Sequence, residues 1–156
     1  MNLFIGRYTS RLDKPVVLFL IGMRINRLRA IRQWSAVLRA MPRMLRELEQ
    51  KKSGLLWYRP YRSGRVFMVQ QYWESFDTLM AYAHDQAGEH FPAWAEFNRR
   101  VGYTDGAVGI WHETYLVEPG KCETIYGNMP LFGLAAAGNH VKAEGRLASA
   151  QDRMRP

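Results

Sequence analysis

Residues 16–26 read VVLFLIGMRIN, and this stretch decides the fold. Pro15 precedes a run of aliphatic and β-branched side chains that is too short for a buried helix and is typical of a strand. Successive side chains of a strand point to opposite faces of its sheet, so a run that is apolar at consecutive positions must be covered on both faces. We therefore expect a buried strand with helices on one face and a second layer on the other.

The elements after this strand can be predicted from hydrophobic period and from turn residues. They are a helix over residues 33–50, a hairpin of strands 55–61 and 66–73 joined through Ser63-Gly64, a helical region in two pieces after Ser75 and from Pro92, and a strand over 109–115. The resulting order is βαββαβ. It predicts an α+β fold with a ferredoxin-like sheet. A partner sheet is the simplest cover for the second face of strand 16–26, so we expect a homodimer.

Length and composition define the class of protein. The 156 residues fit one domain, which we place over residues 1–138 as a ferredoxin-like α+β-barrel domain. From residue 139 the composition becomes polar and loses its period, so residues 139–156 are expected to be a mobile tail. Cys122 is the only cysteine, which favours a reducing, cytoplasmic setting. The apolar run at 16–25 is too short to span a membrane as a helix, and no signal-peptide cleavage site follows it.

The formal net charge of +8 comes mainly from arginine and raises nucleic acid or an anionic surface as partners. Seven arginines alternate with apolar residues as on the outer face of an amphipathic element: Arg24, Arg27, Arg29, Arg32, Arg39, Arg43 and Arg46. No zinc finger or RNP-type aromatic strand accompanies them. We interpret these arginines as a solvated face and expect no nucleic-acid partner. A second interpretation, that the protein binds anionic surfaces through its arginines, rests on charge alone.

Several motifs carry a family resemblance. They are Gly22-Met23-Arg24-Ile25-Asn26, Tyr72-Trp73-Glu74-Ser75, His90-Phe91-Pro92-Ala93-Trp94 with Phe97-Asn98-Arg99, Gly109 to Tyr115, and Asn128-Met129-Pro130 through Gly133-Leu134. In these motifs the chain resembles, over residues 5–138, the monooxygenase-like family found in fumagillin-type biosynthetic clusters and many bacterial genomes. More distantly it is similar to antibiotic-biosynthesis monooxygenases, heme-degrading monooxygenases and aldoxime dehydratases. The resemblance implies a dimeric α+β barrel with a pocket between sheet and helices, and oxidation of a small hydrophobic metabolite with heme or without a cofactor.

Two candidate site residues follow from the resemblance. Trp73 matches the tryptophan after which the heme-degrading and antibiotic-biosynthesis enzymes continue Trp-x-Ser into a helix. Asn26 is similar to the pocket asparagine of those enzymes, whose amide can hold an oxygen intermediate. Each residue has a structural alternative, because aromatic side chains commonly pack in cores and asparagine commonly ends strands.

His84 and His90 are the candidates for a ligand carried by a helix. If helical geometry extends back to His90, this histidine shares a stripe with Trp94 and Phe97 and faces the sheet, where a neutral imidazole could bind heme iron. If Pro92 starts the helix, His90 is instead a loop or capping residue. His84 lies at the edge of its helix's apolar face, as at a solvated helix end.

The strand at 109–115 holds the strongest candidates, His112, Glu113 and Tyr115. Alternation places His112 on one face and Glu113 with Tyr115 on the other, so one of the two faces is structural. On the helix side, His112 could act as a base or as a hydrogen-bond donor to a substrate oxygen, and Glu113 could pair an arginine across a dimer interface. A satisfied core histidine is the alternative for His112.

The resemblance implies a monooxygenase-like oxidoreductase of secondary metabolism. Its site would use Asn26, Trp73, His112 and Tyr115, with His90 as the ligand if heme is bound. A zinc site is not expected, since no second histidine or cysteine stands at ligand spacing, and phosphate-loop, nucleophile-elbow and dinucleotide motifs are absent from the sequence. The alternative is a non-catalytic dimer that binds heme or a hydrophobic ligand in the same cavity.

Overall fold

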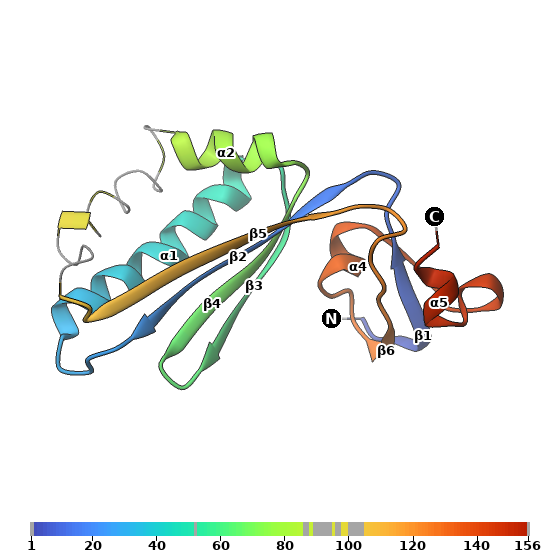
Figure 1. Cartoon of the computed structure of the whole chain (residues 1–156), viewed down its shortest axis with the longest axis horizontal. Coiled ribbons are helices and arrows are strands. Elements are labelled where there is room, and N and C mark those ends of the chain that lie inside the picture. Colours follow the sequence, from blue (N-terminus) through green and yellow to red (C-terminus); the bar gives the residue numbers. More distant parts are fainter. Residues whose placement is uncertain are drawn as a thin grey trace.

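A computed structural model describes residues 2–51, 53–85, 88, 95, 98–99 and 105–155. The main sheet has the antiparallel strand order β3-β4-β2-β5. Its strands are β2 (Val16–Ile25), β3 (Leu55–Ser63), β4 (Val66–Trp73) and β5 (Val108–Val117). Helices α1 (Ile31–Lys51) and α2 (Phe76–His84) lie on one face of this sheet (Figure 1). The predicted βαββαβ order and α+β class are confirmed, whereas Pro92 and the helix expected from it lie outside the described residues.

The core between the helices and the sheet follows from strand alternation. Its buried residues are Val17, Leu45, Leu48, Val69, Trp73, Leu79 and Tyr82. Alternate positions of β2 and β4 supply the sheet side, and α1 and α2 supply the other side. We call the sheet face that carries Val17, Val69 and Trp73 the helix-side face, and the face that carries Leu18, Gln70 and Tyr72 the distal face.

Local signals place both helices as expected. Ser75 caps α2: its Oγ accepts from the Thr78 backbone N–H at 3.1 Å, and Thr78 Oγ1 accepts from the Ser75 N–H at 3.3 Å. The seven arginines from Arg24 in β2 to Arg46 in α1 are all exposed, as an amphipathic outer face requires. None of the described helices is long and apolar enough to cross a membrane.

A second sheet, which the sequence did not predict, stands beside the main one (Figure 1). Its strand order is β6-β1-β7, formed by β1 (Phe4–Arg11), β6 (Tyr126–Met129) and β7 (Asn139–Lys142). Three short elements accompany it: α4 (Leu134–Ala137), η1 (Gly145–Leu147) and α5 (Ala150–Arg153). Two of the strands have only four residues, and β1 pairs with strands more than a hundred positions away, so no local period reveals the sheet.

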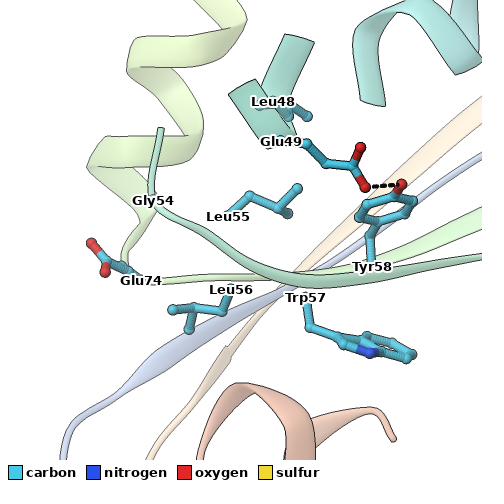
Figure 2. A pocket seen from close by; sticks show the side chains of 8 residues that line it. All are labelled: Leu48, Glu49, Gly54, Leu55, Leu56, Trp57, Tyr58 and Glu74. Carbon is cyan, nitrogen blue, oxygen red and sulfur yellow. Dashed lines mark hydrogen bonds between the residues drawn. The ribbon is translucent and has the colours of Figure 1, made fainter. Parts of the chain in front are cut away.

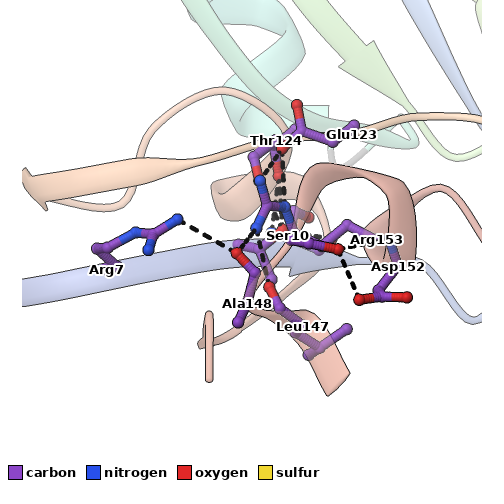
Figure 3. A network of polar contacts seen from close by, with 10 residues as sticks. Arg7, Ser10, Glu123, Thr124, Leu147, Ala148, Asp152 and Arg153 are labelled. Atoms are coloured by element: carbon purple, nitrogen blue, oxygen red, sulfur yellow. Dashed lines mark hydrogen bonds and ion pairs between the residues drawn. The ribbon is translucent and has the colours of Figure 1, made fainter. Parts of the chain in front are cut away.

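The C-terminal segment, expected as a tail, has regular structure. Its strand β7 pairs with β1, and Arg153 in α5 donates to the carbonyl oxygens of Leu147 and Ala148 at 2.8 and 2.9 Å. Arg153 Nε also donates to Glu123 Oε1 at 2.7 Å, and Figure 3 shows this network. The Arg153 side chain is 6% exposed, so its charge is desolvated and paired. The domain boundary at residue 138 stays a prediction.

The distal face is covered at one end by this same chain. Leu134 of α4 packs with Val16 and Tyr72, and the rings of Trp57 and Phe132 lie 5.2 Å apart in an edge contact. At that end the cover is therefore a segment of this chain beyond its helices α1 and α2, and not the partner sheet that we expected as the simplest cover. The second layer there comes from residues after β5, whose pairing with the sheet depends on tertiary contacts.

Candidate functional site

Trp73 is sealed in the core and has a polar partner there. Its side chain is 0% exposed and its ring centroid lies 5.7 Å from that of Tyr82. The indole Nε1–H donates to Gln71 Oε1 at 2.8 Å. Trp73 therefore packs in the core, which was the structural alternative named for it in the sequence. The hydrogen bond to Gln71 also fixes the orientation of its ring.

Gln71 is the site residue that sequence reasoning missed. It is 5% exposed and lies on the helix-side face, in register with Phe19 on β2 and Tyr58 on β3. Its neighbours on the same face of β4 are Val69 and Trp73, which are both buried. A signal was available, because a glutamine at an inward position of an otherwise apolar strand face must find partners or serve a function.

His112 lies on the helix-side face, at the edge strand β5. It stands opposite Ile21 in the β2–β5 register, and its ring centroid is 5.8 Å from that of Phe19. The side chain is exposed, so the alternative of a buried core histidine does not apply. Thr114 stands opposite Phe19 on the same strand. Gln71, Phe19 and Thr114 therefore form one row across three strands, with His112 beside it at the edge.

Tyr115 and Asn26 do not join this row. Tyr115 stands opposite Leu18 on the distal face, and its hydroxyl donates to Glu113 Oε2 at 2.6 Å. That hydrogen bond raises the pKa of the Tyr115 phenol. Asn26 follows the end of β2, and its Nδ2 donates to the Gly106 carbonyl oxygen at 3.0 Å. This is the structural role of an asparagine that ends a strand. The structure thus does not bring together all the residues that the sequence proposed for one site.

The described histidines do not fit an axial heme ligand inside the fold. His84 is exposed at the end of α2, where its Nδ1 lies 2.9 Å from the Met80 carbonyl oxygen. His112 is exposed on the edge strand β5, and His140 lies in the second sheet, stacked on Tyr8. Within the described ranges, no group of three histidine, cysteine or acidic side chains could hold a metal ion. His90 lies outside those ranges, so its role as a ligand stays a prediction.

A hollow of about 420 Å³ lies at the β3 edge of the main sheet (Figure 2). It is lined by Leu48, Glu49, Gly54, Leu55, Leu56, Trp57, Tyr58 and Glu74. The Tyr58 hydroxyl donates to Glu49 Oε1 at 2.7 Å, and this bond raises the pKa of Tyr58 to about 12. Neither Trp73 nor strand β5 lines this hollow, so it is separate from the pocket that the sequence led us to expect.

Several solved structures are similar to this chain. Aldoxime dehydratase OxdRE, in complex with butyraldoxime, has 17% identity and a TM-score of 0.67 over 96% of this chain and 43% of that one. A second aldoxime dehydratase structure has 20% identity and a TM-score of 0.58 over 96% and 44%. SnoaB, a cofactor-independent oxygenase from Streptomyces nogalater, has 12% identity and a TM-score of 0.43 over 64% and 90%. The chain spans less than half the length of the aldoxime dehydratases, and no curated protein matches it in sequence.

The two aldoxime dehydratase structures show the α+β fold that the resemblance implied. In sequence, the family described as Monooxygenase af470-like matches residues 16–134, from the first residue of β2 to the first residue of α4. That match covers the whole main sheet together with the row of Gln71, Phe19 and Thr114. The chain belongs to the Monooxygenase af470-like family.

Proposed function

We propose that this protein is a monooxygenase-like enzyme that oxidises a small hydrophobic molecule on the helix-side face of its sheet. The observation that carries the proposal is the row on that face, where the buried Trp73–Gln71 pair lies beside the Phe19 ring and leads to His112 at the open edge. Such a row combines apolar and aromatic surface with a few polar groups, as small-molecule sites do. Membership in a monooxygenase family supports the reaction class.

The proposed chemistry assigns a role to each side chain. Monooxygenation places one oxygen atom of O₂ in the product and releases the other in water. Without an added reductant the balance closes when an activated CH₂ group becomes C=O, because the substrate then supplies every electron that O₂ accepts. Such a CH₂ group must first lose a proton, and the exposed His112 side chain would be the base that accepts it. Phe19 would hold the hydrophobic substrate next to that base.

The reaction is tested by measuring O₂ consumption and ¹⁸O incorporation from ¹⁸O₂ with a panel of aromatic ketones and phenols that contain an acidic CH or CH₂ group. We expect uptake with at least one compound and a loss of about 100-fold or more in His112→Ala, since general-base catalysis contributes that order. His84→Ala is the matched control, because His84 is also exposed but lies at the end of α2. Ligand binding without O₂ uptake would contradict the enzyme and favour the non-catalytic carrier.

Heme dependence is tested separately. If His90 is an axial ligand, added hemin gives a Soret band that shifts in His90→Ala and persists in His112→Ala, because the ligand sets the coordination of the iron. Identical spectra of the wild type and His90→Ala would remove His90 as a ligand. A wild type that fails to bind hemin supports oxidation without a cofactor. We route no step through heme, because the described histidines do not fit it.

We also propose a homodimer that buries the uncovered part of the distal face. That part carries Trp111, whose ring lies directly over Gly22, and the neighbouring side chains of Leu20 and Met68. An aromatic and aliphatic surface of this kind on a sheet is commonly an interface. Light scattering at micromolar concentration tests this proposal, and a stable monomer would contradict it.

A further inference from the structure

We propose that the Gln71 carboxamide donates the hydrogen bond that holds a neutral carbonyl oxygen of the substrate, with Trp73 as its positioning residue. This inference rests on the proposed function and names the ligand class of the same helix-side face. It requires that the amide have one fixed orientation, an available N–H and an apolar setting. Each of these conditions is met by described residues.

The orientation of the amide is set by the chemistry of its partner. An indole N–H can donate and cannot accept, so the group that Gln71 presents to Trp73 must be the carbonyl oxygen Oε1. The distance from Trp73 Nε1 to Gln71 Oε1 is 2.8 Å, within the ordinary range of a hydrogen bond. The amide nitrogen Nε2 is therefore held on the side away from the indole.

That amide nitrogen has no acceptor in the described part of the chain. Gln71 is 5% exposed, and its one hydrogen bond there is the one it accepts from Trp73. Gln71 Nε2 is not among the described side-chain atoms that are both sealed from solvent and unpaired, so this donor keeps access to solvent and can be reached by a ligand. An oxygen atom from a bound ligand would supply the missing acceptor.

The adjacent glutamine shows that the strand can satisfy such a group. Gln70 points to the distal face, where its Oε1 accepts from the Tyr61 hydroxyl at 3.0 Å and its Nε2 donates to the Tyr72 hydroxyl at 3.2 Å. Both ends of that amide are used. In Gln71 only the oxygen end is used, although the residue is more deeply buried.

The surroundings select the class of acceptor. In the sheet layer, Gln71 is flanked by the Phe19 and Tyr58 side chains, and Val69 and Trp73 adjoin it along β4. None of these four side chains carries a positive charge that would balance a carboxylate or phosphate. A neutral carbonyl on a planar hydrophobic molecule fits, since its oxygen accepts from Nε2 while its apolar body lies against Phe19.

A matched pair of probes tests the carbonyl directly. 1-Tetralone differs from tetralin only in having a C=O in place of one CH₂ group. Calorimetric titration gives the affinity of the protein for each compound. We expect the wild type to bind the ketone about threefold to tenfold more tightly, the range for one neutral hydrogen bond. In Gln71→Met this ratio should fall to about one, with the tetralin affinity nearly unchanged. Gln70→Met, the control on the distal face, should keep the wild-type ratio.

Trp73 is tested through its effect on the ratio rather than on stability. Trp73→Phe removes the indole N–H and leaves the Gln71 amide without its fixed orientation. As a single substitution it should therefore lower the ratio of ketone affinity to tetralin affinity. In the Gln71→Met background the same substitution should change the ratio no further. A purely structural role for Trp73 would lower the affinities for both probes equally and leave the ratio intact.

The inference fails if the wild type binds neither probe, if it binds both equally, or if Gln71→Met keeps the wild-type ratio. Where Gln71→Met does not fold, Gln71→Glu replaces it, because a carboxylate keeps the acceptor for Trp73 and loses the donor. The ketone preference must then disappear in the ionised variant. Binding is measured without turnover, so a protein that prefers the ketone but consumes no O₂ would contradict the proposed oxygenase and leave the Gln71 donor in place.

Discussion

The two faces of the main sheet differ in how they pair a glutamine with hydrogen-bond partners. On the distal face, Gln70 lies in a closed series of hydrogen bonds between the Tyr61 and Tyr72 hydroxyls. On the helix-side face, Gln71 is paired at its oxygen end by Trp73, and its nitrogen end is available. A face whose polar groups satisfy one another is built for packing, whereas a donor that has no acceptor in the described chain and is not sealed from solvent is available to a ligand.

The aromatic side chains of the two faces differ in the same sense. Trp73 is enclosed by α1, α2 and the sheet, while Trp111 lies flat over Gly22 on strand β2. The first ring holds together the layers of one chain. The second covers the backbone of a neighbouring strand on a face that we propose is buried in a dimer. Substitutions on each face should therefore have separable effects.

Trp73→Ala should produce the largest effect, lowering the free energy of unfolding by about 3–5 kcal/mol, because it leaves a cavity in a side-chain core with no exposed edge. Urea denaturation followed by circular dichroism measures it. Trp111→Ala is the control on the distal face and should cost clearly less when both variants are measured at a protein concentration at which the chain is monomeric, since that ring is only partly buried within one chain. Equal losses in the two variants would contradict the distinction between the faces.

Alkaline pH should destabilise the protein through Tyr72, whose burial raises its pKa to about 12 from an ordinary value of 10.0. The folded state holds this proton more tightly than the unfolded state, so the stabilisation is complete below pH 10 and is lost as the pH rises through 12. The loss attributable to Tyr72 is about 2–3 kcal/mol.

Urea denaturation between pH 8 and pH 12 measures this decline in the wild type and in Tyr72→Phe. The variant should be less stable at pH 8, by about 1 kcal/mol, because Gln70 Nε2 loses its acceptor. Its decline above pH 10 should be shallower than that of the wild type. Parallel curves would show that Tyr72 does not control the alkaline transition.

Gly22→Ala should lower the free energy of unfolding by about 1–3 kcal/mol, because a Cβ at this position would overlap the Trp111 ring and force it to move. If the distal face forms the dimer interface, the same variant should also dissociate at a higher protein concentration. Gly109→Ala is the matched control on the same face. Its added Cβ would lie 3.5 Å from Asn26 Nδ2, an ordinary contact, so its stability should stay within about 0.5 kcal/mol of the wild type.

His112→Ala should have the smallest effect on stability, within about 0.5 kcal/mol, because the side chain is exposed at the sheet edge. Its expected loss is in O₂ consumption. A large fall in melting temperature would identify His112 as a structural residue, in contradiction of the role proposed here. This variant therefore separates catalysis from folding on the helix-side face.

The main sheet was predictable because its signals are local. The apolar run at 16–25, the Ser63-Gly64 turn and the capping Ser75 each act through neighbours close in sequence, and the structure confirms the strand, hairpin and helix that they predicted. The separation of His112 from Glu113 and Tyr115 onto opposite faces was also predictable, because side-chain alternation along a strand has a fixed period. Period alone could not tell whether that histidine would be enclosed or exposed.

Tertiary structure alone decided which polar groups meet. The sequence determined the βαββαβ order, and strand alternation separates His112 from Tyr115. Only the folded sheet shows that Trp73 donates a hydrogen bond to Gln71 and that Asn26 donates one to the Gly106 carbonyl oxygen. It also decided that strands β6 and β7 join β1 and that Leu134 covers one end of the distal face. These outcomes depend on contacts between residues far apart in the chain, whose free energies come from burial and pairing that no local pattern encodes.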